Sequence, residues 1–262
     1  MQIDMTGRVA LVTGASRGIG AAVARAFRFA GARVAIAARD ADALDRLADE
    51  LGRDDGQALA LPTDVSDPEA VAEMVDRVVA ELGRLDFACN NAAGGGHPPT
   101  PLAEIPIDAF DSMQAISLRG VFLSMRAEIP AMLGSGGGAI VNMSSTAGLQ
   151  AVGGIAGYVA AKHGVEGLTK VAALDYGALG IRVNALAPGP ILTDNLERAG
   201  AGAQRAAAAA MPLQRVGQPE EVAAGAVWLC SEQAGFITGT TLTIDGGKLA
   251  GTPPFQVKAG PR

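Results

Sequence analysis

The sequence is short of the residues that would indicate several common kinds of protein. Its 262 residues include two cysteines and two histidines, and the net charge is −6. Cys89 and Cys230 have neither metal-ligand nor disulfide-framework spacing, so we expect reduced thiols in a cytoplasmic protein and no bound metal. The negative charge gives no indication of a nucleic acid or an anionic membrane as partner. No signal peptide is expected, and no apolar run is long enough to span a bilayer.

Apolar residues are abundant by contrast, at 49% of the chain, and short apolar runs alternate with helical patterns. The runs show little apolar–polar alternation, which is typical of strands buried on both faces of a parallel sheet. We therefore predict one α/β domain over residues 1–262, with a doubly wound Rossmann-type sheet and helices on both faces. The expected strands are residues 9–13, 33–37, 58–61, 85–89, 138–143, 182–186 and 241–244. The expected helices are residues 20–29, 42–51, 68–82, 107–133, 158–179 and 219–230.

Tyr158 and Lys162 stand four residues apart in an expected helix, so their side chains lie on one face of it. An ammonium beside a phenol favours the phenolate, so we expect the pKa of Tyr158 to fall below its ordinary value of about 10. A phenol whose pKa is nearer neutrality is a usable general acid or base. The pair alone is a weak indication, because this spacing often arises by chance, and its weight depends on the other motifs.

A glycine-rich turn joins the first expected strand to the first expected helix. Glycines let the backbone approach a pyrophosphate closely, and the start of a helix offers free N–H groups and the positive end of its dipole. The spacing Gly-x-x-x-Gly-x-Gly differs from the common Gly-x-Gly-x-x-Gly fingerprint, so an ordinary turn is the alternative. The residues predicted to bind a dinucleotide here are Gly14, Ser16, Arg17, Gly18, Ile19 and Gly20.

The end of the second strand indicates which dinucleotide is bound. An acidic residue there would bind the adenosine ribose, whereas an arginine accommodates a 2′-phosphate. The strand ends at Ala38 and Arg39, and Arg17 in the glycine-rich turn is a second cation. Asp40 and Asp42 follow closely, and a solvated surface role for Arg39 is the alternative. The sequence predicts NADP(H) as the preferred cofactor, with NAD(H) as the second possibility.

Taken together, these motifs resemble those of the short-chain dehydrogenase/reductase family. Five motifs occur in the order and spacing of that family, over about residues 5–248. They are Thr13-Gly14 to Gly20, Asn90-Asn91-Ala92, Ser145, Tyr158-x-x-x-Lys162 and Pro188-Gly189. The resemblance implies an oxidoreductase with seven parallel strands and, commonly, a homotetramer.

The same resemblance implies further contacts with the cofactor. Asp64 and Val65 would flank the adenine, and Asn90 would lie near the ribose at the end of the fourth strand. Lys162 would also hold the nicotinamide ribose. The remaining cofactor contacts implied are Asn91, Ala92, Tyr158, Pro188, Gly189, Ile191 and Thr193. The chain departs from the family at Ala93, where a glycine is usual, and the loop that follows is expected to be shifted or looser.

The chemistry that the resemblance implies is hydride transfer to a carbonyl carbon, which leaves alkoxide character on the oxygen. Tyr158 would donate the proton, Lys162 would lower its pKa, and Ser145 would hydrogen-bond the same oxygen. Ser144 is the alternative serine, but the family spacing selects Ser145. The family carries an asparagine in a proton relay where this chain has Ser117, whose side chain has a single polar atom. Ser117 is therefore a candidate fourth member of the catalytic group.

The segments expected to contact substrate carry few charges. Residues 190–215 occupy the position of the family's lid and are largely apolar, which favours a small or medium, mostly apolar carbonyl compound or alcohol. His97 is a candidate substrate contact, although a loop histidine without a role is the commoner case. The tail 249–262 is expected to be disordered or packed on the surface, with capping of a pocket by Phe255 as the alternative.

Four functions agree with these motifs, and the leading one is an NADP(H)-dependent carbonyl reductase or alcohol dehydrogenase. A 3-oxoacyl-carrier-protein reductase would need a basic patch for its acidic partner, for which Arg119 and Arg126 are a thin indication. Glucose 1-dehydrogenase-like activity is disfavoured by the apolar lid. A non-catalytic protein that senses the cofactor would have no need of Ser145, Tyr158 and Lys162 together.

Overall fold

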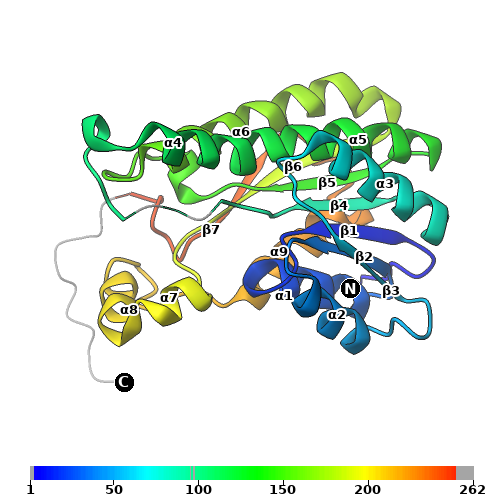
Figure 1. Cartoon of the computed structure of the whole chain (residues 1–262), viewed down its shortest axis with the longest axis horizontal. Helices are drawn as coiled ribbons and strands as arrows, with labels where there is room; N and C mark the ends of the chain where they lie inside the picture. Colours follow the sequence, from blue (N-terminus) through cyan, green and yellow to red (C-terminus); the bar gives the residue numbers. More distant parts are fainter. Residues whose placement is uncertain (1–2, 95, 97, 252–262) are drawn as a thin grey trace.

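Seven strands form a single parallel sheet in the computed structural model, which describes residues 3–94, 96 and 98–251 (Figure 1). The strand order is β3-β2-β1-β4-β5-β6-β7, as the doubly wound fold predicts. The strands are β1 (Val9–Thr13), β2 (Arg33–Ala38), β3 (Ala58–Pro62), β4 (Phe87–Asn90), β5 (Gly138–Met143), β6 (Ile181–Pro188) and β7 (Thr241–Ile244). The chain reverses its direction of travel across the sheet between β1 and β4, and ligands of such sheets bind at the carboxyl ends of the strands there.

Helices cover both faces of the sheet, and each face has its own apolar core (Figure 1). On one face lie α1 (Gly18–Phe29), α2 (Ala41–Glu50) and α9 (Pro219–Cys230). On the other lie α3 (Pro68–Leu82), α5 (Gly120–Gly134) and α6 (Ala156–Tyr176). Three shorter helices are α4 (Ile107–Gln114), α7 (Asp194–Arg198) and α8 (Gly200–Ala209). The predicted helices are thus confirmed within a few residues of their expected ends.

Local sequence explains where these elements begin. All five residues of β1 are buried, as expected of a central strand covered on both faces. Asp67 caps α3 by accepting hydrogen bonds from the backbone N–H groups of Glu69 and Ala70, and Pro68 takes the first helical position, where no N–H donor is needed. Phe27 of α1 stacks on Phe87 of β4 with ring centroids 5.9 Å apart, which ties this helix to the sheet.

The long helix expected over residues 107–133 is present but not uniform. A π-helical turn over Ala115–Arg119 separates α4 from α5. Such single turns are frequently found at functional sites. No local pattern predicts this turn, because the apolar periodicity runs through it without a glycine or proline inside it. Ser117, the candidate fourth catalytic residue, lies within this turn.

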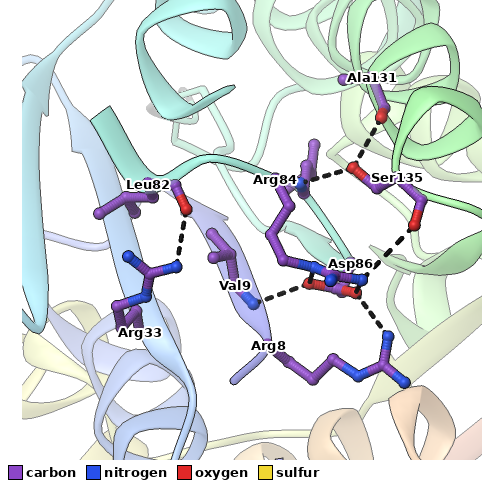
Figure 2. Close-up of polar contacts among 9 residues, drawn as sticks. Arg8, Val9, Arg33, Leu82, Arg84, Asp86, Ala131 and Ser135 are labelled. Carbon is purple, nitrogen blue, oxygen red and sulfur yellow. Dashed lines mark hydrogen bonds and ion pairs between the residues drawn. The ribbon is translucent and has the colours of Figure 1, made fainter. Parts of the chain in front are cut away.

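A buried carboxylate organises the amino-terminal edge of the sheet, beside the start of β4 (Figure 2). Asp86 accepts hydrogen bonds from Arg8 at 2.9 Å, from Arg84 at 2.6 and 2.7 Å, and from the backbone N–H of Val9 at 2.9 Å. Burial raises the pKa of Asp86, but these hydrogen bonds outweigh that effect and hold the pKa below its usual value. The nearby Ser135 side chain accepts from the Leu85 N–H and donates to Ala131.

Some expectations fall on residues outside the described ranges. These are His97, Phe255 and the tail from residue 252 onward. Of the expected tail, residues 249–251 are described. Within the described ranges, no helix is both long and apolar enough to cross a membrane.

Candidate active site

A cleft of about 460 Å³ opens at the carboxyl ends of β1, β2, β3 and β4, on both sides of the point where the strand order reverses. Its walls come from the loops that follow these four strands, from the π-helical turn and from the start of α7. The predicted cofactor residues that line it are Gly14, Ser16, Arg17, Gly18, Ile19, Arg39, Asp64, Val65, Asn91, Ala92 and Thr193. Eleven residues chosen from separate stretches of sequence therefore meet in one cleft.

The glycine-rich turn is packed too tightly for side chains at two of its positions. Gly14 has a φ of +64°, and a Cβ there would lie 2.7 Å from the Cα of Ala92. A Cβ on Gly20 would lie 2.2 Å from the carbonyl oxygen of Gly14. The Asn91 side chain donates to the carbonyl oxygens of Thr13 and Gly14 at 3.2 and 3.1 Å. Gly20 therefore allows the start of α1 to pack closely against Gly14, although Gly20 itself does not line the cleft.

Both predicted phosphate-binding cations lie at the cleft. Arg39 is exposed at the end of β2, and no ion pair holds it within the described residues. Asp40 accepts a hydrogen bond from the Ala43 N–H and so caps α2. Arg17 reaches Asp194 of α7 at 3.8 Å, and both side chains are about half exposed or more, so this pair is weak.

The two asparagines at the end of β4 have different roles in the structure. Asn91 faces the cleft and holds the glycine-rich turn, as described above. Asn90 is 2% exposed and points into the core, where its amide donates to Glu128 and Asn142 at 3.0 and 3.1 Å. The implied position of Asn90 at the end of the strand is therefore present, but its side chain supports the cleft from the inside.

Ser145 and Tyr158 are brought together by a hydrogen bond between their side chains. Ser145 follows β5 and caps the short 3₁₀ turn Thr146–Gly148 by accepting from the Ala147 N–H at 3.1 Å. Its hydroxyl proton is thus directed to the oxygen of Tyr158, a half-buried residue near the start of α6. Ser144, the alternative, is 2% exposed and its hydroxyl has no partner among the described residues. The geometry favours Ser145, as the family spacing does.

Lys162 is buried one turn beyond Tyr158 and its nitrogen lies 5.6 Å from the centre of the tyrosine ring. The ammonium donates to the Met143 carbonyl oxygen at 2.6 Å. Burial lowers the pKa of Lys162 to about 8, while Glu166 opposes that fall. An ammonium has three donors, and a single bond is recorded for it in the described part of the chain.

The expected fall in the pKa of Tyr158 is wrong for this structure. Burial raises the pKa of Tyr158, and the hydrogen bond from Ser145 lowers it less. The Lys162 nitrogen lies 5.6 Å from the centre of the ring, and burial lowers the pKa of Lys162 itself to about 8. The pair therefore shares a face as predicted, but spacing on a helix does not give the position of the nitrogen relative to the oxygen.

Ser117 is fully buried and its hydroxyl is engaged within the π-helical region. It accepts from the Gly94 N–H at 3.0 Å and donates to the Met113 sulfur at 3.2 Å. One lone pair of the hydroxyl remains free of the bonds recorded here. The serine therefore ties the loop after β4 to the π turn, and its part in a relay stays a prediction.

The segment after β6 divides between two cavities. Thr193 faces the glycine-rich turn, since a Cβ on Gly18 would lie 3.3 Å from its methyl group. Ile191 lines a second cavity of about 270 Å³ instead, together with Met211 and Leu213 of the predicted lid. Pro188 ends β6, and Gly189, which follows it, bonds to the Ile244 carbonyl of β7, so these two residues shape the turn without lining the first cleft.

Several residues of the cleft were not predicted. Thr13 does not line the cleft but supports its wall, because its hydroxyl accepts from the N–H groups of Asn91 and Ala92 at 3.1 and 3.2 Å. Thr63, Ile116 and three other residues line the walls; those three are Asp40, Asp194 and Asn195. The position of Thr63 directly before Asp64 at the end of β3 was a usable signal. Nothing local to Ile116 or Asn195 indicates the cleft, since helix packing places them there.

Known proteins resemble this chain over most of its length. Residues 14–248 match the model of a family described as Enoyl-(Acyl carrier protein) reductase. An A-factor type gamma-butyrolactone 1'-reductase of Streptomyces virginiae is 44% identical over 248 residues, which cover 93% of this chain and 96% of that protein. A D-threitol dehydrogenase of Mycolicibacterium smegmatis is 42% identical and a cyclohexanol dehydrogenase of Acinetobacter sp. is 39% identical, with 93–96% coverage.

The chain belongs to the short-chain dehydrogenase/reductase family. A crystal structure of a short-chain type dehydrogenase/reductase from Mycobacterium marinum superposes with a TM-score of 0.88 and 36% identity, covering 95% of this chain and 98% of that one. Members of this family are oxidoreductases that use NAD(P)(H) and act on alcohol or carbonyl groups. The cleft and the Ser145–Tyr158–Lys162 group are therefore the candidate cofactor and catalytic regions of this short-chain dehydrogenase/reductase.

Proposed function

We propose that this short-chain dehydrogenase/reductase interconverts a carbonyl compound and a secondary alcohol with NADP(H), and that Tyr158 is its general acid and base. The observation that carries the proposal is the hydrogen bond between Ser145 and Tyr158 beside the buried ammonium of Lys162. A phenol held this way donates a proton to a developing alkoxide, and Ser145 orients the same oxygen. In the reverse direction the phenolate of Tyr158 accepts the proton of the alcohol and becomes the phenol again.

The described residues fit a nicotinamide dinucleotide. Gly14 and Gly18 of the glycine-rich turn line the cleft, and the turn runs into the start of α1, where helix N–H groups can bind a pyrophosphate. Arg39, exposed and free of ion pairs in the described residues, supports recognition of a 2′-phosphate. Lys162 retains donors for ribose hydroxyls. When bound, the nicotinamide supplies or accepts the hydride.

A small or medium, mostly apolar substrate is the second part of the proposal. The cavity beside the predicted lid is bounded by apolar side chains of Ile191, Met211 and Leu213. Of its three charged residues, Arg215 and Glu221 satisfy each other through two hydrogen bonds of 2.6 and 2.7 Å, and Asp245 accepts from the backbone N–H groups of Gly247 and Leu249. The relatives named for a gamma-butyrolactone and for cyclohexanol are consistent with uncharged ring compounds.

We further propose one domain with a lid over residues 190–215, and a homotetramer in the cytoplasm. Large apolar side chains exposed on the helices of one face support assembly. Ile107 is 80% exposed, Phe122 47%, Val171 55% and Leu174 84%. Isolated apolar side chains are ordinary, but four on α4, α5 and α6 are consistent with contacts between copies.

The experiment that tests the function measures dissociation constants of NADPH and NADH on the purified protein, followed by turnover with a carbonyl panel. The panel contains small ketones, cyclic ketones, a lactone-bearing ketone and an acetoacetyl thioester. Tighter binding of NADPH with ketone-dependent oxidation supports the proposal. Turnover of the thioester alone would support a carrier-protein reductase. Cofactor binding without turnover in either direction would support a sensor and contradict the catalytic roles.

A further inference from the structure

Glu128 of α5 is a carboxyl group buried without a cation. Its side chain is 0% exposed, and no ion pair joins it to a basic residue within the described residues. Burying an ionised carboxylate without a partner is costly, and such a group usually becomes neutral instead. The catalytic and cofactor roles argued above make no use of this residue.

The contacts of Glu128 lead to the end of β4. Its Oε2 accepts from the Asn90 amide at 3.0 Å, and the same amide donates to Asn142 of β5 at 3.1 Å. The Asn142 amide donates in turn to Thr169 of α6 at 3.0 Å and to the Met125 sulfur at 3.3 Å. Two strands and two helices are thus joined by one chain of buried side-chain hydrogen bonds.

Two acceptors in this chain of bonds lack a donor. Glu128 Oε1 and Asn90 Oδ1 are both buried and have no partner among the described residues. They belong to two side chains that are already bonded to each other through Oε2 and the amide. An ionised carboxylate can only accept, and would leave both atoms unsatisfied. A proton on Oε1 gives the pair the donor that it lacks.

The surroundings of Glu128 favour its neutral form. The titratable neighbour on β4 is Cys89, whose own pKa is raised first by burial and further by Cys230 and Glu128. From β5 and α6 the facing polar groups are the neutral Asn142 and Thr169. The buried residues of α3, which packs on α5, are all apolar. Burial in these surroundings raises the pKa of Glu128 to about 7, and the hydrogen bond from Asn90 opposes the rise.

We propose that Glu128 is a positioning residue which, as a neutral carboxylic acid, donates from Oε1 to Asn90 Oδ1 and so holds the carboxyl end of β4 in the form that binds the dinucleotide. Asn90 is followed directly by Asn91, whose side chain holds the carbonyl groups of Thr13 and Gly14 in the glycine-rich turn. The backbone N–H groups of Asn91 and Ala92 donate to the Thr13 hydroxyl. A displacement of Asn90 would therefore also displace Asn91 and, through these hydrogen bonds, the glycine-rich turn, which form two walls of the cleft.

The proposal predicts that cofactor binding depends on pH because a group of the protein titrates, separately from any titration of the cofactor. Apparent affinity falls with the fraction of molecules in the competent form. With a pKa of about 7, Glu128 is mostly neutral at pH 6, and about one molecule in ten is neutral at pH 8. The dissociation constant of the wild-type protein should therefore rise about tenfold between these pH values.

Three variants separate positioning from a merely structural role. Glu128→Gln keeps the shape, accepts through its carbonyl and donates through its amide at every pH. Glu128→Leu keeps the volume and removes both hydrogen bonds. Glu81→Gln is the matched control, because Glu81 is an exposed carboxylate that pairs with Arg77 on α3. Dissociation constants for NADPH and NADH are measured from pH 6 to pH 8.5, and the ratio of variant to wild type is compared, since the 2′-phosphate titrates identically in all samples.

The expected ratio of variant to wild-type dissociation constant stays constant with pH for Glu81→Gln and falls about tenfold between pH 6 and pH 8 for Glu128→Gln, because only proteins that keep Glu128 lose affinity over this range. Glu128→Leu should bind more weakly than Glu128→Gln at pH 6. Binding with the same pH profile in the wild type and Glu128→Gln would overturn this inference and leave the proposed function intact. Failure of the wild type to bind either dinucleotide would overturn both, because the inference rests on the dinucleotide occupying this cleft.

Discussion

A buried carboxyl group lies beside each end of β4, and the two groups have opposite surroundings: Asp86 precedes the strand, and Glu128 of α5 contacts its last residue. At the amino end, Asp86 is surrounded by Arg8, Arg84 and a backbone donor, and its pKa is held below the usual value (Figure 2). At the carboxyl end, Glu128 meets an asparagine and no cation in the described residues, and its pKa is raised to about 7. One carboxyl is therefore ionised in the folded protein and the other is neutral at moderate pH.

The difference follows from what each edge of the sheet does. At the amino edge no ligand is expected, and the polar groups satisfy one another, which favours stability. At the carboxyl edge, Lys162 and Arg39 keep donors that no described residue uses in full, and we propose that a cofactor uses them. Changes at the amino edge should therefore reduce stability, whereas changes at the carboxyl edge should reduce activity.

The largest expected effect is on turnover at the carboxyl edge. Tyr158→Phe removes the proton donor and should lower kcat about 10²- to 10⁴-fold, which is the usual contribution of a general acid or base. The free energy of unfolding should change little, because Tyr158 is only half-buried and its ring is retained. Steady-state kinetics and a cofactor titration measure the two effects. Unchanged turnover would remove Tyr158 from the mechanism.

The largest expected loss of stability is at the amino edge. Asp86→Asn leaves two arginines without their carboxylate and should lower the free energy of unfolding by about 3 kcal/mol. Denaturant unfolding at neutral pH measures this loss. Asp45→Asn, which breaks an exposed pair with Arg53, should cost less than about 1 kcal/mol and is the control. Equal losses in the two variants would contradict the distinction between the edges.

The two carboxyl groups should give the stability opposite pH dependences. The folded state holds the proton of Glu128 more tightly than the unfolded chain, so this stabilisation is complete below about pH 4.5 and is lost as the pH rises through about 7. The loss is about 3 kcal/mol at most. The pKa of Asp86 is lowered on folding, so its contribution is present above about pH 4 and is lost as the pH falls.

Unfolding curves from pH 4.5 to pH 8.5 test the alkaline half of that prediction. Glu128→Gln should remove most of the decline in stability above pH 5 and leave the acid side unchanged. If the decline in stability persists in Glu128→Gln, other titratable groups cause it. The contrast between Asp86 and Glu128 would then be wrong.

A smaller effect is expected at the adenosine end of the cleft. Arg39→Ala should weaken NADPH binding about tenfold and leave NADH binding nearly unchanged, because one charged contact with the 2′-phosphate is lost. Arg17→Ala should have a weaker effect, since Arg17 is already near Asp194 at 3.8 Å. Isothermal titration with both cofactors measures the difference. Equal losses for NADPH and NADH would show that Arg39 does not recognise the phosphate.

The smallest effect is expected at Ser117. If its relay works but is suboptimal, Ser117→Asn preserves or modestly raises turnover, because an amide has two polar atoms where the hydroxyl has one. The hydroxyl is bonded to Gly94 and Met113, so the larger side chain must keep the Gly94 contact. Turnover numbers at saturating substrate measure this. A lower turnover with unchanged cofactor affinity would contradict the relay hypothesis.

Local sequence predicted the elements well because each carries its own signal. The cap at Asp67 with Pro68 and the buried run of β1 were both legible from neighbouring residues. The π-helical turn at Ala115–Arg119 was not, because it interrupts the helix without a helix-breaking residue. The order of the catalytic residues was legible as well, but the pKa of Tyr158 was not, because burial and the position of Lys162 decide it.

By itself, the sequence of this short-chain dehydrogenase/reductase determined the strands, the helices and the identity of the residues that gather at the carboxyl edge. It did so because periodicity, caps and glycine turns act over a few residues. Only the tertiary structure decided which side chains face inward, so that Asn91 turns to the cleft while Asn90 turns to Glu128. The charge of a buried group depends on partners 38 residues away and on exclusion from water, and no local pattern contains either.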